Sequence, residues 1–341
     1  MRHIINVIVL IVVVTVGLLF LVNKIDWMPV AASTAAGPID WLFGLNLDVI
    51  TVLYVLVNGI MLYSVFAFRR KRGDDSEGAY FHSNTKLEIS WIVIPTVVVL
   101  AFAVIGGSVL KQVSAADKDE LKVIVTGRQW SWTFEYPDLG ITTTELNLPI
   151  NKQAHFLLHS EDVIHSFWVP QFRLKQDLVP GQEEELRITP TLRGSYQLMC
   201  AELCGTSHAY MVAPVNVLSA ADFEIWRQKR LGIYKEPAGG GAGEDPAALG
   251  AKVASSAGCA ACHSIDGSKL VGPSWKGLYG RTETMADGST VTADDAYLHE
   301  SIVNSGAKLV QGYADLMPKN YGDALTEQEI KGVIEYIKTL K

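Results

Sequence analysis

Hydrophobic and polar positions divide the chain into a membrane part and a water-soluble part. Three long apolar blocks lie in the first third of the chain, at residues 4–22, 49–68 and 89–110. Each is about long enough to cross the ~30 Å hydrocarbon core of a bilayer as a helix. From Lys118 onward the composition is that of an ordinary soluble protein. The pattern predicts a transmembrane helical hairpin at residues 45–112, preceded by an N-terminal hydrophobic segment at residues 1–30.

The basic run at residues 69–72 predicts the orientation, because Lys and Arg that flank a span stay on the cytoplasmic side. The second block then runs from outside to inside, the third returns, and the rest of the chain lies outside. The first block allows two interpretations. Its length favours a retained span, whereas the small residues at 30–33 could form the cleavage site of a signal peptide. Both interpretations place Asp26 outside.

Beyond the membrane part, short runs rich in β-branched and aromatic residues predict strands. Turn signals such as Val179-Pro180-Gly181 separate these runs. Several short strands at this spacing predict a small β-sandwich or barrel within a domain at residues 118–232. Ser219 is expected to cap its closing helix, which ends near Arg230. The predicted strands are residues 121–137, 155–159, 163–169, 184–189, 195–199 and 213–218.

A glycine-rich segment and a second domain follow. Residues 236–246, E-P-A-G-G-G-A-G-E-D-P, have the composition of a flexible linker, which we assign to 233–246. The third of the helices predicted next opens with the capping box Thr326-Glu327-Gln328-Glu329. Its apolar stripe consists of Ile330, Val333, Ile334 and Ile337. An all-α domain is therefore predicted at residues 247–341, with helices at 246–257, 293–304 and 326–340.

Charge and cysteine content narrow the functional classes. A length of 341 residues suits two or three domains, and the net charge of -7 argues against nucleic acid as a partner. All four cysteines fall in two tight pairs, in C-A-E-L-C-G-T-S-H-A-Y-M and in C-A-A-C-H. No cysteine is left over for a structural disulfide. Two redox-metal motifs in tandem predict a protein that carries electrons.

The first cysteine pair lies close to other soft metal ligands. Cys200 and Cys204 are followed by His208 and Met211, and His165 is the candidate for a second imidazole. Thiolate, thioether and imidazole ligands favour copper over harder cations, and two neighbouring thiolates can bridge two copper ions. A disulfide or a structural zinc site is the alternative. The disulfide leaves the histidines and the methionine unexplained, and zinc more often uses paired C-x-x-C knuckles.

The sequence from about residue 45 to 230 resembles subunit II of the haem-copper respiratory oxidases. The resemblance covers the membrane hairpin, G-R-Q-W-S-W-T-F-E-Y, E-D-V-I-H-S-F-W-V-P, L-K-Q-D-L-V-P-G and the cysteine-rich signature. It implies a cupredoxin-like β-sandwich with a dinuclear CuA centre. It also implies that Glu202 gives its backbone carbonyl to copper and its carboxylate to a magnesium ion shared with subunit I. The implied side-chain ligands of copper are His165, Cys200, Cys204, His208 and Met211.

The same resemblance implies roles for two residues outside the ligand set. Trp130, the first tryptophan of Q-W-S-W, is expected to lie exposed over the copper on the electron entry route, although a fused haem domain competes for that role. Glu88 fits a capping box, Thr85-Lys86-Leu87-Glu88, at the start of a membrane helix. In the family, a glutamate at this place on the cytoplasmic side marks the entrance of a proton channel into subunit I.

The second cysteine pair, Cys259 and Cys262, forms the c-type haem attachment signature, with His263 as an axial ligand. With the preceding helix, V-G-P-S-W-K-G-L-Y-G-R and D-L-M-P, the motif resembles class I cytochrome c across residues 246–341. This resemblance implies Met317 as the sixth ligand, since a thioether stabilises ferrous iron. Met285 is the rival, in a polar loop that lacks the following proline.

These resemblances predict a multidomain membrane protein of the class of cytochrome c oxidase subunit II with a fused C-terminal cytochrome c. We expect electrons to pass from one covalent haem c to CuA and on to subunit I. There, cytochrome-c oxidase reduces oxygen to water with proton translocation. The expected location is the bacterial plasma membrane, with both metal domains on the periplasmic side. Expected partners are subunits I and III, and a quinol-oxidising complex or a small soluble electron carrier as donor.

Three other functions use similar motifs. The equivalent subunit of a nitric oxide reductase is the nearest alternative, and Glu88 argues against it only weakly. A membrane-tethered copper carrier would not need a haem domain. A nitrous oxide reductase needs a second, histidine-rich copper site, which the eight histidines of this chain do not supply.

Overall fold

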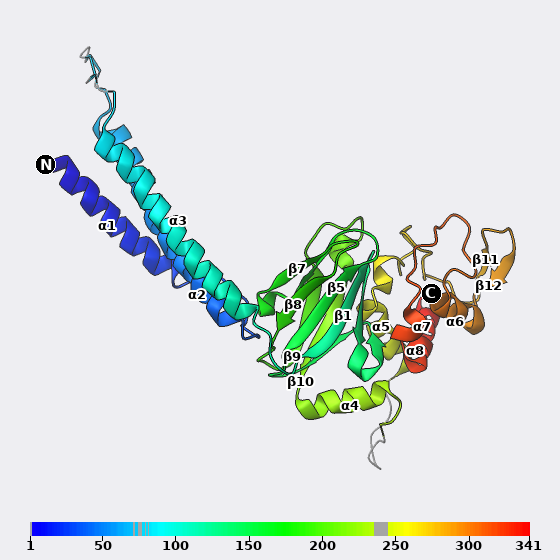
Figure 1. The fold of residues 1–341 in the computed structure, drawn as a ribbon. Coiled ribbons are helices and arrows are strands. Elements are labelled where there is room, and N and C mark those ends of the chain that lie inside the picture. Colours follow the sequence, from blue (N-terminus) through cyan, green and yellow to red (C-terminus); the bar gives the residue numbers. More distant parts are fainter. Residues whose placement is uncertain (1, 71, 74–76, 79, 81, 235–244) are drawn as a thin grey trace. The chain divides into compact units, whose positions relative to one another are not determined.

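The structure is a computed structural model that describes residues 2–70, 72–73, 77–78, 80, 82–234 and 245–341. The chain forms two compact units, which are described separately below (Figure 1). One contains the residues up to Val30 together with Ala36–Ala115, and the other contains Ala31–Ala35 and Ala116–Lys341. Most of the predicted linker at 233–246, and Lys71 of the basic run, lie outside the described residues.

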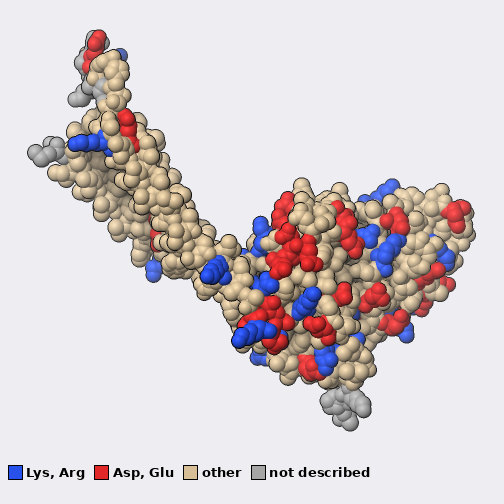
Figure 2. All heavy atoms as spheres, viewed as in Figure 1, with Lys and Arg blue, Asp and Glu red and all other residues tan. Residues whose placement is uncertain are grey.

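Three apolar helices make up the first unit, as the sequence predicts. All three are long and apolar enough to cross a membrane. Helix α2 packs against α1 and contacts α3, and most large apolar side chains of the three are exposed in the isolated chain. Figure 2 shows these helices as a surface that charged residues seldom interrupt. Such a surface is stable in lipid rather than in water. The helices are α1 (Arg2–Val22), α2 (Ala36–Ala67) and α3 (Thr85–Val113).

The start of α3 differs from the prediction by one residue. Its N-cap is Asn84, whose side-chain oxygen accepts a hydrogen bond from the Leu87 N–H at 3.2 Å. The Asn84 N–H in turn donates to Glu88 Oε1 at 3.1 Å. The capping box predicted from Thr85 to Glu88 is therefore wrong in register, because asparagine is the better cap and lies one position earlier.

The larger unit begins with a sandwich of two five-stranded sheets (Figure 1). One has the strand order β3-β2-β1-β5-β8 and the other β4-β10-β9-β6-β7. Two parallel pairs, β1 with β5 and β10 with β4, join otherwise antiparallel sheets. The strands are β1 (Leu121–Arg128), β2 (Ser131–Tyr136), β3 (Ile141–Thr143), β4 (Leu146–Pro149), β5 (Ala154–Ser160), β6 (His165–Trp168), β7 (Lys175–Leu178), β8 (Glu184–Ile188), β9 (Gly194–Cys200) and β10 (Val212–Leu218).

Alternating side chains of these strands form the core. Every second residue of β1 and of β10 is buried, as expected for strands with one face inside. The largest buried side chains are aromatic, and each contributes about 1.5–3 kcal/mol by leaving water. The closing helix α4 (Ala220–Arg230) has Ser219 as its N-cap, as predicted. The predicted run 121–137 is a hairpin of two strands, and β3, β4 and β7 are additional to the prediction.

A short segment between α1 and α2 belongs to the sandwich. Ala32 and Ser33 are buried there. The Ala32 N–H donates to the carbonyl of Gln171, the Thr34 N–H to that of Thr189, and the Ser33 hydroxyl to that of Phe172 at 2.9 Å. The sequence pattern gives no sign of these contacts, because a run of small residues is typical of an ordinary surface loop.

The C-terminal part of this unit is helical. Its α8 begins with the predicted capping box between Thr326 and Glu329, and the predicted apolar stripe on α8 is buried. Gly250 lies against the backbone of Gly332 where α5 crosses α8. The short helix α7 and a two-stranded hairpin are additional to the prediction. The elements are α5 (Pro246–Ser256), a 3-10 turn (Cys259–Ala261), β11 (Thr282–Thr284), β12 (Thr290–Thr292), α6 (Asp295–Val303), α7 (Tyr321–Ala324) and α8 (Glu327–Thr339).

Candidate metal centres

One end of the sandwich gathers the predicted copper ligands. His165 is the first residue of β6, and the neighbouring strand β9 ends at Cys200. The following loop carries Cys204 and passes through a 3-10 turn, His208–Tyr210. It returns Met211 next to Cys200, whose N–H donates to the Met211 carbonyl at 3.0 Å. Strand pairing therefore brings together ligands that are far apart in the sequence.

The ligand atoms converge. The sulfur of Cys200 lies 3.7 Å from that of Cys204 and 3.9 Å from His165 Nδ1. The sulfur of Cys204 lies 3.5 Å from His208 Nδ1 and 3.7 Å from the thioether of Met211. His208 is partly buried, and the other four side chains are buried. The structure brings together all five side chains that the sequence predicts as ligands.

This donor set fits a soft metal. Two thiolates bound to one ion at about 2.3 Å, with a tetrahedral angle between the bonds, lie about 3.8 Å apart. The observed separation of 3.7 Å is close to that value and far from the roughly 2.05 Å of a disulfide. Both cysteines are free. The Glu202 carbonyl, 3.2 Å from the Cys200 sulfur, adds a further donor. Thiolate, thioether and imidazole together select copper.

The cysteine pair is prepared to bind a metal. Hydrogen bonding with the Cys204 thiol outweighs burial and, together with His165, lowers the pKa of Cys200 to about 3. The same hydrogen bond and burial raise the pKa of Cys204. The pair therefore holds one thiolate at neutral pH, and the thiolate is the form that binds metals.

Asp162 orients His165, a role that the sequence analysis missed. Its carboxylate accepts a hydrogen bond from His165 Nε2 at 2.8 Å and another from the Gln129 N–H at 2.8 Å. The proton on Nε2 leaves Nδ1 free to face the sulfurs. Burial raises the pKa of Asp162, but hydrogen bonds from Gln129, His165 and Val163 outweigh this effect and hold the pKa below its ordinary value. The spacing D-x-x-H was the available signal, since ligating histidines commonly donate to a carboxylate.

Trp130 differs from the expected exposed position. Its side chain is only 7% exposed and packs in the core of the sandwich. Its Nε1 donates to the Cys204 carbonyl at 3.2 Å, which also accepts from Gln129 Nε2 at 2.6 Å. The expectation of an exposed ring is wrong. Both side chains hold the copper loop in place, and Gln129 is a second residue that the sequence analysis missed.

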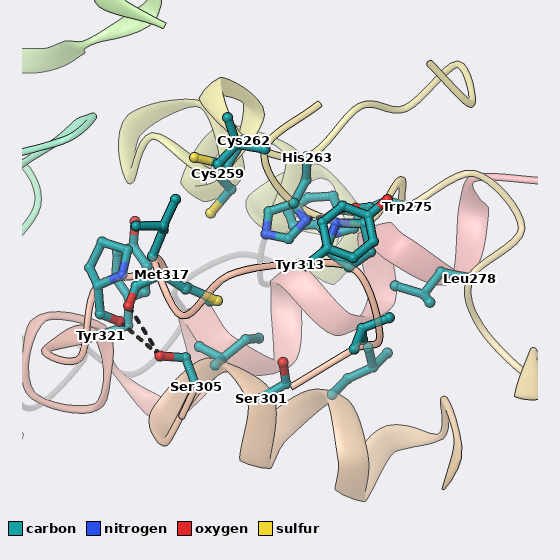
Figure 3. A pocket seen from close by; sticks show the side chains of 18 of the residues that line it. Cys259, Cys262, His263, Trp275, Leu278, Ser301, Ser305, Tyr313, Met317 and Tyr321 are labelled. Atoms are coloured by element: carbon teal, nitrogen blue, oxygen red, sulfur yellow. Dashed lines mark hydrogen bonds between the residues drawn. The ribbon is translucent and has the colours of Figure 1, made fainter. Parts of the chain in front are cut away.

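A cavity in the helical part gathers the predicted haem-binding residues (Figure 3). Cys259, Cys262, His263 and Met317 all line it. The rest of its wall is largely apolar, with side chains such as Val271, Leu278, Leu298, Ile302, Val310 and Leu316. Burial raises the pKa of Cys259 to about 12 and that of Cys262 to about 11, so both are thiols at neutral pH. A largely apolar cavity with two thiols, an imidazole and a thioether on its wall suits a haem.

His263 is held as a ligand with a fixed proton. Its Nδ1 lies 2.8 Å from the carbonyl of Pro273, which can only accept, so Nδ1 carries the proton. Burial lowers the pKa of His263, which keeps the ring neutral and leaves Nε2 as an electron-pair donor. The ring also stacks on Trp275, with 5.2 Å between centroids. The ring is thus fixed both by a hydrogen bond and by stacking.

The two candidate methionines lie in different places. Met317 lines the cavity, and its carbonyl accepts a hydrogen bond from Ser305 at 3.2 Å. Met285 is buried in the helical core next to β11 and does not line this cavity. The polar loop predicted around Met285 therefore hides a buried side chain, which packs as a core residue.

Comparison with known proteins identifies the family of this chain. "Cytochrome c oxidase subunit 2" of Alkalihalophilus pseudofirmus is 31% identical over 339 residues, covering 95% of this chain and 94% of that protein. The protein of the same name from Synechocystis is 32% identical over 262 residues, covering 63% of this chain and 79% of that protein. The chain belongs to the cytochrome c oxidase subunit II family.

Family descriptions match this subunit II chain along most of its length. They are the subunit II transmembrane domain at residues 20–106, the subunit II periplasmic domain at 139–219, and cytochrome c at 247–341. The crystal structure of the periplasmic domain of subunit II of Bradyrhizobium japonicum is 28% identical, with a TM-score of 0.33. It covers 36% of this chain and 100% of that chain. The sandwich of this subunit II chain is cupredoxin-like, and its domains imply copper and haem binding.

Two carboxylates of the subunit II chain have predicted roles other than binding copper or haem. The Glu202 side chain is exposed on the copper loop. Glu88 lies in the first turn of α3, in the membrane unit, where its carboxylate accepts from the Asn84 N–H. Both remain predictions as magnesium ligand and proton-channel residue, respectively.

Proposed function

We propose that this chain is the electron-entry subunit of a respiratory cytochrome c oxidase, passing electrons from the haem domain to the copper domain and on to subunit I. The observation that carries the proposal is that one chain gathers thiol, thioether and imidazole donors at one end of the sandwich and a second donor set around an apolar cavity. His263 and Met317 line this cavity together with Cys259 and Cys262, and a haem held by these residues would supply one-electron transfer.

Each site has residues with distinct tasks. When bound, the two metals supply one-electron redox chemistry. Cys200, Cys204, His165, His208 and Met211 would together hold a dinuclear copper centre. Buried, hydrogen-bonded donors of this kind cannot move far when the charge of the site changes. Cys259 and Cys262 would bind one haem covalently through thioethers.

The remaining roles follow the family resemblance. Glu202 would reach a magnesium ion at the border with subunit I, and Glu88 would mark the entrance of a proton channel. Trp130 would relay electrons from inside the protein. The basic run after α2 supports an orientation with both metal domains on the periplasmic side of a bacterial plasma membrane. Subunit III and a quinol-oxidising complex or small carrier would be further partners.

Purification of the native complex tests the proposal. We expect turnover with oxygen, one covalent haem c on this chain, and a seven-line copper hyperfine pattern in EPR that Cys200→Ser removes. A four-line copper spectrum would contradict the dinuclear site. Turnover with nitric oxide and none with oxygen would mean that the complex is a nitric oxide reductase and not an oxidase.

A further inference from the structure

The haem-binding loop directly contacts the copper loop. The Ser207 hydroxyl, one residue before the ligand His208, donates to the carbonyl of Ala261 at 2.7 Å. Ala261 lies between the two haem-binding cysteines, and its 3% exposed side chain packs with the core of the sandwich. The backbone of Gly258 is so close to the Trp130 carbonyl that an added Cβ would lie 3.0 Å from this oxygen. This contact helps to bury Trp130.

A second contact lies at the end of α4. The guanidinium of Arg230 donates to Glu329 at 2.8 Å and to the carbonyl of Ala324 at 2.6 Å, both in the helical domain. It also donates to the carbonyl of Thr142 in β3 at 2.8 Å. The side chain of Arg230 is only 11% exposed. A planar guanidinium with fixed donors holds its partners in one geometry.

Two further contacts lie between the two domains. The Asn320 side chain donates to the Thr133 hydroxyl of β2 at 2.7 Å. A Cβ added to Gly258 would lie 3.5 Å from the side chain of Ser131, on the same strand. The contacts therefore extend along β2 and β3 and specify one relative position of the two domains.

We propose that the haem domain is seated on the copper domain in this one position, and that Arg230 is the positioning residue that holds it there. This inference rests on the proposed function. If electrons pass from the haem domain to the copper domain, a fixed relative position of the two domains keeps the two metal sites at one separation. A linker alone would hold the domain nearby in many orientations. We call this interface between the two domains the seat. Each transfer moves one electron across it, and no atom is transferred.

The chain offers a matched control. Arg227 lies on the same helix and pairs with Glu224 of that helix at 2.7 Å. Arg227→Ala therefore removes the same charge from α4 without touching the contacts of Arg230. Arg230→Ala leaves the haem and copper ligands intact, so haem absorbance and copper EPR report whether both domains remain folded.

Hydrogen–deuterium exchange of the full-length chain in detergent tests the seat directly. In Arg230→Ala, amide exchange should rise at least about tenfold in peptides covering 128–134, 204–210 and 257–263, whereas Arg227→Ala should match the wild type. Exchange at wild-type rates in Arg230→Ala would overturn the proposal. If that variant fails to fold, Arg230→Lys and Thr133→Val each remove fewer contacts. Each should raise exchange about threefold, and wild-type exchange in both would overturn the proposal equally.

The rate of haem-to-copper electron transfer separates this inference from the proposed function. In Arg230→Ala the rate should fall at least about tenfold and become dependent on ionic strength, as expected for a domain that must find its partner by diffusion. Raised exchange with an unchanged rate would support the seat and contradict the proposed electron route.

Discussion

At the residue scale, three of the predicted metal ligands are positioned by neighbours that are not ligands themselves. Asp162 holds His165, Gln129 and Trp130 hold the Cys204 carbonyl, and the Pro273 carbonyl fixes the proton of His263. Asp162 and Pro273 thereby determine which ring nitrogen of each histidine is free to bind a metal. Mutating them should weaken a site without removing any ligand.

Asp162 offers the clearest test of such a neighbour. In Asp162→Ala, His165 loses its acceptor, and we expect copper affinity to fall about 10–100-fold, the usual effect of removing an outer partner of a metal ligand. Asp162→Asn keeps an acceptor oxygen, so its copper affinity should lie between those of Asp162→Ala and the wild type. Glu161→Ala is the control, because Glu161 pairs only loosely with Arg128, at 3.6 Å. Competition with a copper chelator gives the affinities, and equal values for both alanine variants would argue against the role of Asp162.

The two methionines predict different losses. In Met317→Ala the far-red absorption band typical of sulfur–iron ligation should vanish while the covalent haem remains. In Met285→Ala the band should persist, but the domain should lose about 2–5 kcal/mol of stability, because a buried methionine leaves a cavity. Absorption spectra and denaturant titrations of the full-length chain check both. A band that disappears only in Met285→Ala would mean that the ligand is Met285.

Glu145, a partly buried residue near Arg230, predicts a dependence on pH. Burial and the neighbouring Glu329 raise its pKa, although Arg230 lowers it. A carboxyl group whose pKa is higher in the folded than in the unfolded protein stabilises the fold at pH values below its unfolded-state pKa. This contribution is lost as the pH rises through its folded-state pKa. Glu145→Gln should therefore be more stable than wild type at pH 7, by a margin that shrinks toward pH 4. Tryptophan fluorescence during urea unfolding measures it. Glu135→Gln, exposed on β2, should change little, and a margin that grows toward pH 4 would refute the sign.

At the scale of elements, the sequence predicts the helices and strands whose signals lie close together in the chain. The capping box at Thr326 and the stripe on α8 are confirmed, because helix signals lie within one or two turns of each other. Strand β7 and helix α7 are too short to show a period, so the pattern does not reveal them. Four of the five predicted copper donors are recognisable because they cluster at residues 200–211, and the D-x-x-H spacing offered a signal for Asp162. Gln129 could not be predicted, because only the fold brings it to the carbonyl of Cys204, 75 residues later in the sequence.

The crossing of α5 and α8 depends on a close approach of two backbones. A Cβ built on Gly250 would lie 1.9 Å from the carbonyl oxygen of Gly332. In an ordinary helix Gly→Ala stabilises by about 1 kcal/mol, but here the clash must reverse that sign. Gly250→Ala should therefore lower the midpoint of denaturation of the haem domain. Gly322→Ala in α7, with its nearest contact at 3.6 Å, should be tolerated. Haem absorbance during urea unfolding compares them, and equal midpoints would contradict the close approach.

At the scale of the whole molecule, the proposed electron donor and acceptor share one chain. The haem-to-copper step should therefore be independent of protein concentration, and less sensitive to salt than oxidation of a free cytochrome c, because salt screens long-range steering. Flash reduction of the haem, followed through copper absorbance at several dilutions and salt concentrations, tests both. A rate proportional to concentration would show that another molecule is the immediate donor.

The position of Ala31–Ala35 in the chain affects when the sandwich can finish folding during synthesis. It leaves the ribosome before any strand exists, whereas its partners Gln171, Phe172 and Thr189 come about 140–155 residues later. At 5–20 residues per second, this delay is roughly 7–30 s. For that interval the segment must remain accessible between two newly made membrane helices. Completion of the sandwich therefore requires that the chain has been synthesised beyond β8, to Thr189.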